Sequence, residues 1–119
     1  MTAIEPELFV RRGIEAVEFY KAAFGAVELH RAGESEIVAQ LAVDEARFWV
    51  HDRDADPASG VRLLLVVEDP PAVAAKALAA GATEVSPVGE EHGWLVGRIE
   101  DPFGHSWEIG KPLVHWPPA

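Results

Sequence analysis

The sequence contains no cysteine. This excludes a disulfide framework, a thiolate metal site and a cysteine nucleophile. No apolar run comes near the roughly 18 residues that a membrane-spanning helix needs. The N-terminal segment carries Glu5 and Glu7 where a secretory signal peptide carries basic residues. These absences predict a cytoplasmic protein that does not associate with membranes.

Basic residues are scarce. The sequence has 10 Lys and Arg but 20 Asp and Glu, which gives a formal charge of −10. Nucleic-acid binding needs a basic face, so a nucleic-acid partner is not expected. The charge also disfavours polyanionic ligands and acidic membrane surfaces. It favours a cationic ligand through long-range attraction, or it serves only to keep the protein in solution.

Several catalytic and metal-binding patterns are also missing. The segment DRDAD at 52–56 is similar to the start of a calcium loop, but Pro57 replaces the required glycine and Leu63 replaces the bidentate glutamate. The five histidines show neither HxH nor HExxH spacing. There is no GxSxG and no glycine-rich phosphate loop. A calcium site, a zinc site, a nucleophilic serine and a nucleotide cofactor are therefore not expected.

The order of strand-like and helix-like segments occurs twice along the chain. Apolar alternation and turn residues predict strands and helices of the following ranges. The first half reads strand 5–11, helix 14–24, and strands 27–31, 36–43 and 47–51. The second half reads strand 61–68, a helix over 72–80 entered through Pro70 and Pro71, and strands 84–86, 94–99 and 106–109. Each half is thus a βαβββ module.

The two halves also match in sequence, which indicates an internal repeat. FGAVEL at 24–29 matches AGATEV at 80–85, and FWVHD at 48–52 lies opposite WEIGK at 107–111. In both halves a helix ends on glycine and alanine, and a strand follows. We expect one domain made of a first module at about 1–56, a second module at about 57–112 and a tail at 113–119.

Three motifs carry a resemblance to a known family: EFYKAAFGAVEL, the helix A-x-x-A-x-A-A-G-A, and DPFGHSWEI. Together they resemble the vicinal oxygen chelate superfamily of glyoxalase I and bleomycin resistance protein, over about residues 5–110. The resemblance implies an α+β fold in which two βαβββ modules form curved mixed sheets around a cavity. It also implies a homodimer.

In metal-using members of that superfamily, the ligands come from the first and last strands of each module. Matching by the motifs, these positions hold Glu5 and Trp49 in the first module and Arg62 and Glu108 in the second. Arginine and tryptophan cannot ligate a cation. We therefore expect no cofactor, although a divalent metal held by Glu5, Glu108 and a displaced His51 is the alternative.

The same positions predict a ligand pocket rather than a chelate site. We expect it to be lined by Glu5, Trp49, His51, Arg62, Trp94 and Glu108, with Trp49 stacking on a cationic or aromatic small molecule. Trp107 should point to the opposite side of its strand from Glu108 and pack in the core. His105 should lie in a turn.

The leading hypothesis is a metal-independent small-molecule binding protein of the bleomycin-resistance type, which acts by sequestering its ligand. No catalytic residue is assigned, so enzymatic activity is not the expectation. One alternative is a metal-dependent glyoxalase-like lyase, isomerase or dioxygenase in which Glu108 is a ligand. The other is a degenerate domain with a regulatory or assembly role.

Overall fold

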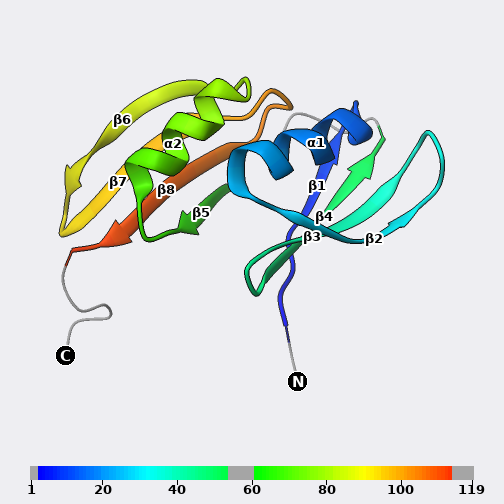
Figure 1. Ribbon diagram of the computed structural model, residues 1–119, viewed down its shortest axis with the longest axis horizontal. Coiled ribbons are helices and arrows are strands. Elements are labelled where there is room, and N and C mark those ends of the chain that lie inside the picture. Colours follow the sequence, from blue (N-terminus) through cyan, green and yellow to red (C-terminus); the bar gives the residue numbers. More distant parts are fainter. Residues whose placement is uncertain (1–2, 54–60, 114–119) are drawn as a thin grey trace. The chain divides into compact units, whose positions relative to one another are not determined.

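The computed structural model describes residues 3–53 and 61–113 (Figure 1). The chain divides into two compact units, Met1–Ala58 and Ser59–Ala119. Residues 114–119 of the expected tail, among them Trp116, lie outside the described residues. No helix in the described ranges is long and apolar enough to cross a bilayer.

The first unit is a four-stranded sheet with one helix. Its elements are β1 (Glu7–Val10), α1 (Gly13–Phe24), β2 (Val27–Ala32), β3 (Val38–Val43) and β4 (Ala46–Asp52). The strand order is β1-β4-β3-β2. The β1 strand pairs with β4 in parallel, whereas the other pairs are antiparallel. The sheet is therefore mixed.

The second unit repeats this architecture. It consists of β5 (Arg62–Val66), α2 (Pro70–Ala79), β6 (Thr83–Glu91), β7 (Trp94–Glu100) and β8 (Ser106–Pro112). The strand order is β5-β8-β7-β6, again with a parallel first pair. The α+β class and the two βαβββ modules predicted from the sequence are confirmed.

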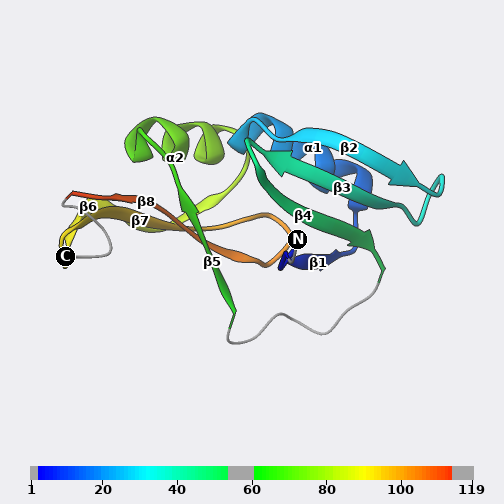
Figure 2. The ribbon, with the colours of Figure 1, turned by 90° about the horizontal axis from the view of Figure 1, so that it is seen from below.

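Each helix covers one face of its own sheet (Figure 2). In the first unit, α1 buries Tyr20 and Phe24 over Leu41, Phe48 and Val50 of the sheet. The Tyr20 and Phe48 rings meet edge to face with centroids 5.3 Å apart. Because side chains alternate along a strand, the residues between these core positions lie on the opposite face.

Helix α1 begins at a contact with the end of β4. It lacks a side-chain cap of its own, and the backbone N–H of Gly13 donates to Asp52 Oδ2 over 3.0 Å. A Cβ on Gly13 would lie only 2.6 Å from Asp52 Cβ and 2.9 Å from Ile37 Cγ1. Glycine at position 13 is therefore required by close packing, and Asp52 supplies the cap from another element.

The second unit has a core centred on Ile99, Trp107 and Ile109, which are at most 5% exposed. Asp101 is 3% exposed and organises the β7–β8 connection. Its carboxylate accepts the N–H groups of Phe103 and His105 and the indole N–H of Trp107, over 2.9, 3.0 and 2.9 Å. The prediction that Trp107 is a core residue is confirmed, and His105 lies in the connection as expected.

Several element ends differ from the predicted ones. The first strand begins at Glu7 rather than at residue 5, because Pro6 has no N–H to donate to the ladder. The β6 strand spans Thr83–Glu91, much longer than the predicted 84–86. Its pairing with β7 shifts register twice, and these irregularities interrupt the alternation that marks a regular strand. The connection from β6 to β7 consists of His92 and Gly93 alone.

Candidate functional site

The face of the first sheet opposite α1 carries a group of polar and aromatic side chains. Cross-strand register places Glu7 and Gln40 beside Trp49, and Phe9 beside His51. Paired residues share a face, and the core residue Val50 between Trp49 and His51 points the other way. We call this surface, made of Glu7, Phe9, Gln40, Trp49 and His51, the first face.

Glu5 joins Trp49 and Gln40 on this surface. The indole N–H of Trp49 donates to Glu5 Oε1 over 2.9 Å, and the amide N–H of Gln40 donates to the same oxygen over 2.8 Å. The other carboxylate oxygen, Oε2, accepts no hydrogen bond from the described residues. The Trp49 ring is therefore fixed by its N–H, and Glu5 keeps one oxygen for a further donor.

His51 belongs to a neighbouring group on the same face. Its Nε2 lies 2.8 Å from Glu7 Oε1, and its ring centroid lies 4.9 Å from that of Phe9. The guanidinium carbon of Arg53 sits 4.9 Å from the centre of the Phe9 ring. His51 is half-buried, with a side-chain exposure of 19%, whereas Glu7 is 55% exposed. Together these residues form a largely aromatic surface beside two carboxylates.

The corresponding face of the second sheet is opposite α2. Trp107, Ile109 and Ile99 point to the core, so the alternating positions point away from it. These positions, which we call the second face, are Arg62, Leu64 and Val66 of β5, Ser106, Glu108 and Gly110 of β8, and Trp94, Val96, Arg98 and Glu100 of β7. Arg62 Nη1 lies 3.7 Å from Glu108 Oε2.

Strand register shows which residues are equivalent in the two units. Glu7 pairs with Trp49, and Leu64 pairs with Glu108, so Glu5 and Arg62 each stand two residues earlier on the corresponding strand. The match between Trp49 and Glu108 therefore agrees with the repeat found in the sequence. Both first-strand positions contact the last-strand position of their own unit.

The same register adds a third equivalent pair. Gln40 lies beside Trp49 on β3, and Arg98 lies beside Glu108 on β7. Each unit thus presents a three-residue group across its first, last and third strands. These groups are Glu5, Trp49 and Gln40 in the first unit, and Arg62, Glu108 and Arg98 in the second.

Comparison with known proteins agrees with this architecture. Residues 10–110 match the family model described as a glyoxalase-like domain. This chain belongs to the glyoxalase-like family. Its fold is that of the wider glyoxalase, bleomycin resistance and dioxygenase superfamily.

Proteins similar to this glyoxalase-like chain come from bacteria and a plant. An uncharacterized protein of Mycobacterium bovis is 33% identical, with 93% of this chain and 84% of the relative covered. A solved gene product of Arabidopsis thaliana aligns with a TM-score of 0.75 at 29% identity, over 93% of this chain and 99% of that chain. The fosfomycin resistance protein of Listeria monocytogenes aligns with a TM-score of 0.79 at 12% identity, over 93% of each chain, which shows the fold alone.

The donor set of this glyoxalase-like chain does not fit a metal of the superfamily type. In each unit one of the two ligand positions holds a group that cannot ligate, Trp49 in the first and Arg62 in the second. The remaining carboxylates already meet N–H donors or a guanidinium. Within residues 3–53 and 61–113, no three His, Asp or Glu side chains form a group that could hold a metal ion.

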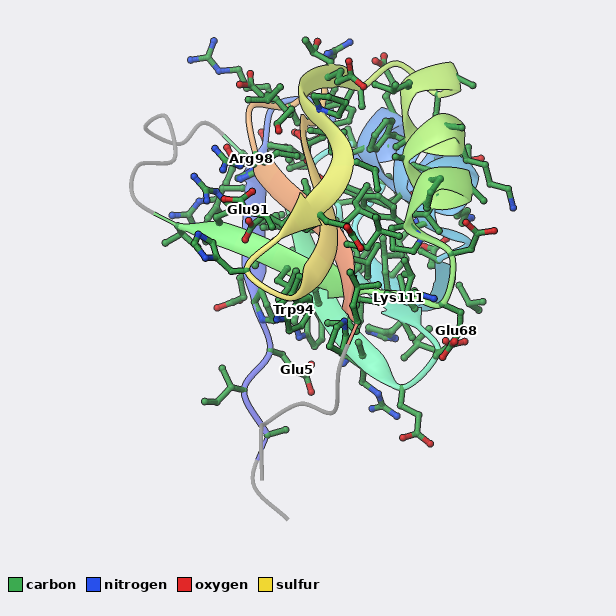
Figure 3. The ribbon with its side chains drawn as sticks, turned by 90° about the vertical axis from the view of Figure 1, so that its left-hand side faces the viewer. Glu5, Glu68, Glu91, Trp94, Arg98 and Lys111 are labelled. Carbon is green, nitrogen blue, oxygen red and sulfur yellow. The ribbon has the colours of Figure 1, made fainter. Side chains whose placement is uncertain are left out.

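The six predicted site residues fall into separate groups. Glu5 and Trp49 are hydrogen-bonded, and His51 lies on the same face but contacts Glu7. Arg62 and Glu108 are close in the second unit. Trp94 lies at the start of β7 with Arg98 farther along that strand (Figure 3). A single pocket that joins all six residues stays a prediction.

Sequence reasoning missed Glu7, Gln40 and Arg98. Glu7 could have been found, because it stands two residues after Glu5 and alternation places it on the same face. Gln40 and Arg98 become neighbours of the site only through the antiparallel register of the third strand in each unit. That register depends on turn length and bulges, which the alternation pattern does not specify.

Proposed function

We propose that this protein is a metal-independent small-molecule binding member of the glyoxalase-like family, of the bleomycin-resistance type. The observation that carries the proposal is that the two ligand positions of each unit contact each other. Glu5 is hydrogen-bonded to Trp49, and Glu108 stands beside Arg62. Such pairs leave each carboxylate with a partner other than a metal ion.

The first face suits an aromatic or cationic ligand. The N–H of Trp49 is already satisfied, so the indole ring offers its π surface for stacking. Glu5 Oε2 supplies a nearby acceptor for an ammonium or another N–H donor. A cation held between the carboxylate and the ring would gain from both contacts. The protein's net charge of −10 favours the same class of ligand.

Sequestration is the mechanism of this proposal. Binding without chemistry lowers the concentration of free ligand, and its effect depends only on affinity and on the amount of protein. In this proposal the protein acts in the cytoplasm.

We propose that the protein is a homodimer. Edge strand β2 exposes Val27 at 60% and Leu29 at 46%, and edge strand β6 exposes Val85 at 55%. Exposed apolar residues on sheet edges favour association with another chain. Sedimentation equilibrium tests this: a dimer is expected, and Leu29→Lys should shift it toward monomer if β2 forms the interface.

Metal analysis tests the metal-independent part of the proposal. Protein purified without chelator, and then incubated with nickel, zinc, manganese or iron(II), should hold far less than one equivalent after desalting. Glu108→Gln should leave that small amount unchanged. One tightly held metal per chain that is lost in Glu108→Gln would instead establish the metal-dependent alternative.

Ligand titration tests the binding part. Benzyltrimethylammonium is a suitable probe because it combines an aromatic ring with a fixed positive charge. It should shift the indole N–H signal of Trp49, identified by its loss in Trp49→Phe. Glu5→Gln should weaken binding about tenfold, the loss of one charge-assisted contact. Glu45→Gln, an exposed carboxylate in the β3–β4 turn, is the matched control and should bind normally.

A probe panel that leaves the Trp49 signal unchanged at millimolar concentration would count against a ligand site on the first face. Equal weakening in Glu5→Gln and Glu45→Gln would mean that only the overall charge matters.

A further inference from the structure

The second face contains a half-buried arginine that has no partner among the described residues. Arg98 stands directly opposite Glu108, with Glu100 two residues along the same strand. Within residues 3–53 and 61–113, however, the Arg98 side chain forms no ion pair and no hydrogen bond, although its backbone takes part in the sheet. Glu108 is instead nearer to Arg62, whose Nη1 lies 3.7 Å away. A guanidinium carries five N–H donors and is costly to remove from water without an acceptor.

The internal repeat shows what the equivalent position does in the other unit. Gln40, the counterpart of Arg98, donates its amide N–H to a carboxylate, that of Glu5. The counterpart of Glu5 in the second unit is Arg62, so the chain supplies no carboxylate at the corresponding first-strand position. The second unit therefore keeps a donor on its third strand and adds another on its first strand.

The second face also carries apolar residues. Leu64 is 47% exposed and Val66 is 57% exposed on β5. Gly110 lies between Val66 and Val96, and a Cβ on Gly110 would come within 3.0 Å of the Val96 side chain. The absence of a side chain at position 110 thus lets Val96 lie close over the strand. This apolar surface begins one residue pair away from Arg98.

Charges on the second face also set its preference among anions. Arg62 and Arg98 are positive, whereas Glu108 and Glu100 on this face, and Glu91 opposite Trp94, are negative. Three carboxylates around two guanidiniums oppose a doubly charged ligand more than a singly charged one. A planar carboxylate also fits the two-pronged donor geometry of arginine.

We propose that the second face binds a small amphipathic monocarboxylate. Its carboxylate is held by Arg98 with Arg62 nearby, and its apolar part lies on Leu64, Val66 and Val96. Figure 3 shows Arg98 and Trp94 on the strand that forms one side of this surface. The inference goes beyond the proposed function, since it concerns the second unit and an anionic group.

Phenylacetate is the probe, and it has close neutral, dianionic and cationic relatives. Calorimetric titration of the full chain should detect phenylacetate. Phenylacetamide and phenethylamine should bind at least tenfold more weakly, because neither offers the guanidinium an anionic acceptor. Benzylphosphonate should also bind more weakly than phenylacetate. Equal or tighter binding of the phosphonate or the amide would overturn the monocarboxylate assignment.

Three charge variants give different expected results. Arg98→Gln should weaken phenylacetate binding about tenfold, through loss of a charge-assisted contact. Glu100→Gln should tighten it by a factor of about two to five, because a nearby negative charge is removed. Lys76→Gln, which removes an exposed positive charge from α2 on the other side of the second sheet, should bind as the parent does.

Binding that is unchanged in Arg98→Gln, or lowered equally in Arg98→Gln and Lys76→Gln, would overturn the inference. Denaturation midpoints of all three variants check that each is folded. This outcome is independent of ligand binding to the first face, which is measured by the Trp49 indole signal and by the Glu5→Gln variant. Phenylacetate binding that depends on Glu5 and not on Arg98 would leave the proposed function standing and reject this one.

Discussion

Trp49 and Glu5 are joined by a hydrogen bond of 2.9 Å between the indole Nε1 and Oε1, across a parallel pair of chain segments. The same two positions in the second unit hold Glu108 and Arg62, 3.7 Å apart. The donor and acceptor have thus exchanged strands between the two halves of the repeat. Each half keeps a polar contact, although neither of the two equivalent positions holds the same residue in both units.

The first prediction concerns this hydrogen bond. Trp49→Phe removes the indole N–H and leaves Glu5 Oε1 with Gln40 as its donor, so the free energy of unfolding should fall by about 1–2 kcal/mol. A double-mutant cycle with Glu5→Ala, which removes the acceptor, gives the coupling between the two side chains when measured by urea denaturation. Strictly additive effects of the two changes would show that the contact contributes nothing to stability.

The second prediction concerns Asp101. Asp101→Ala leaves two backbone N–H groups and the buried Trp107 indole N–H without their acceptor, so unfolding should become easier by about 3 kcal/mol or more. Asp69→Ala is the control, because that exposed carboxylate caps α2 through a single N–H, that of Ala72, among the described residues. It should cost about 1 kcal/mol. Similar losses in both variants would contradict the organising role of Asp101.

The third prediction concerns Gly13. Alanine normally favours a helix over glycine by about 1 kcal/mol, yet Gly13→Ala should destabilise the protein by about 1–3 kcal/mol. The added Cβ would come within 2.6 Å of Asp52 Cβ and would disturb the cap of α1. Gly89→Ala is the matched control, since a Cβ at position 89 would meet no described atom within 4 Å and the φ there is unexceptional. Thermal melts of the two variants should therefore shift unequally, with the larger decrease for Gly13→Ala.

The fourth prediction concerns pH. Hydrogen bonds from Arg31 and then from Lys21 hold the pKa of Glu28 below its ordinary value of 4.5. A lowered pKa in the folded state adds stability above the ordinary value, and this is lost as the pH falls through the folded-state pKa. Glu28→Gln should therefore be less stable than the parent at pH 7, by less than about 1 kcal/mol for this surface cluster. Denaturation series should converge at acid pH, and a difference that persists there would point to packing.

Local patterns predicted most of the fold. Gly25 has a φ of 70°, the left-handed conformation that ends α1, and it was recognisable because an apolar helical pattern stops there. The duplicated order of elements, with FGAVEL and AGATEV in matching places, made two βαβββ modules the natural interpretation. The length of β6 was missed because its two register shifts break the alternation.

The polar groups of the two faces were only partly predictable. Pairs on the first and last strands of a module, such as Arg62 and Glu108, followed from the repeat and from a resemblance. Gln40 and Arg98 did not, because they reach their groups through strand pairing, which is a property of the folded sheet. The cap of α1 by Asp52 could not be predicted for the same reason, because Gly13 and Asp52 are far apart in the sequence.

The parallel pairing of β1 with β4 also has a consequence during protein synthesis. The first strand of the unit pairs with the last, and β4 lies between β1 and β3 in the sheet. A nascent chain that ends before Ala46 therefore lacks the central partner of two other strands. Helix and hairpin contacts can form early, whereas completion of the sheet must await translation of the whole module. The second unit is built on the same order, so its sheet is likewise completed only after β8 has been synthesised.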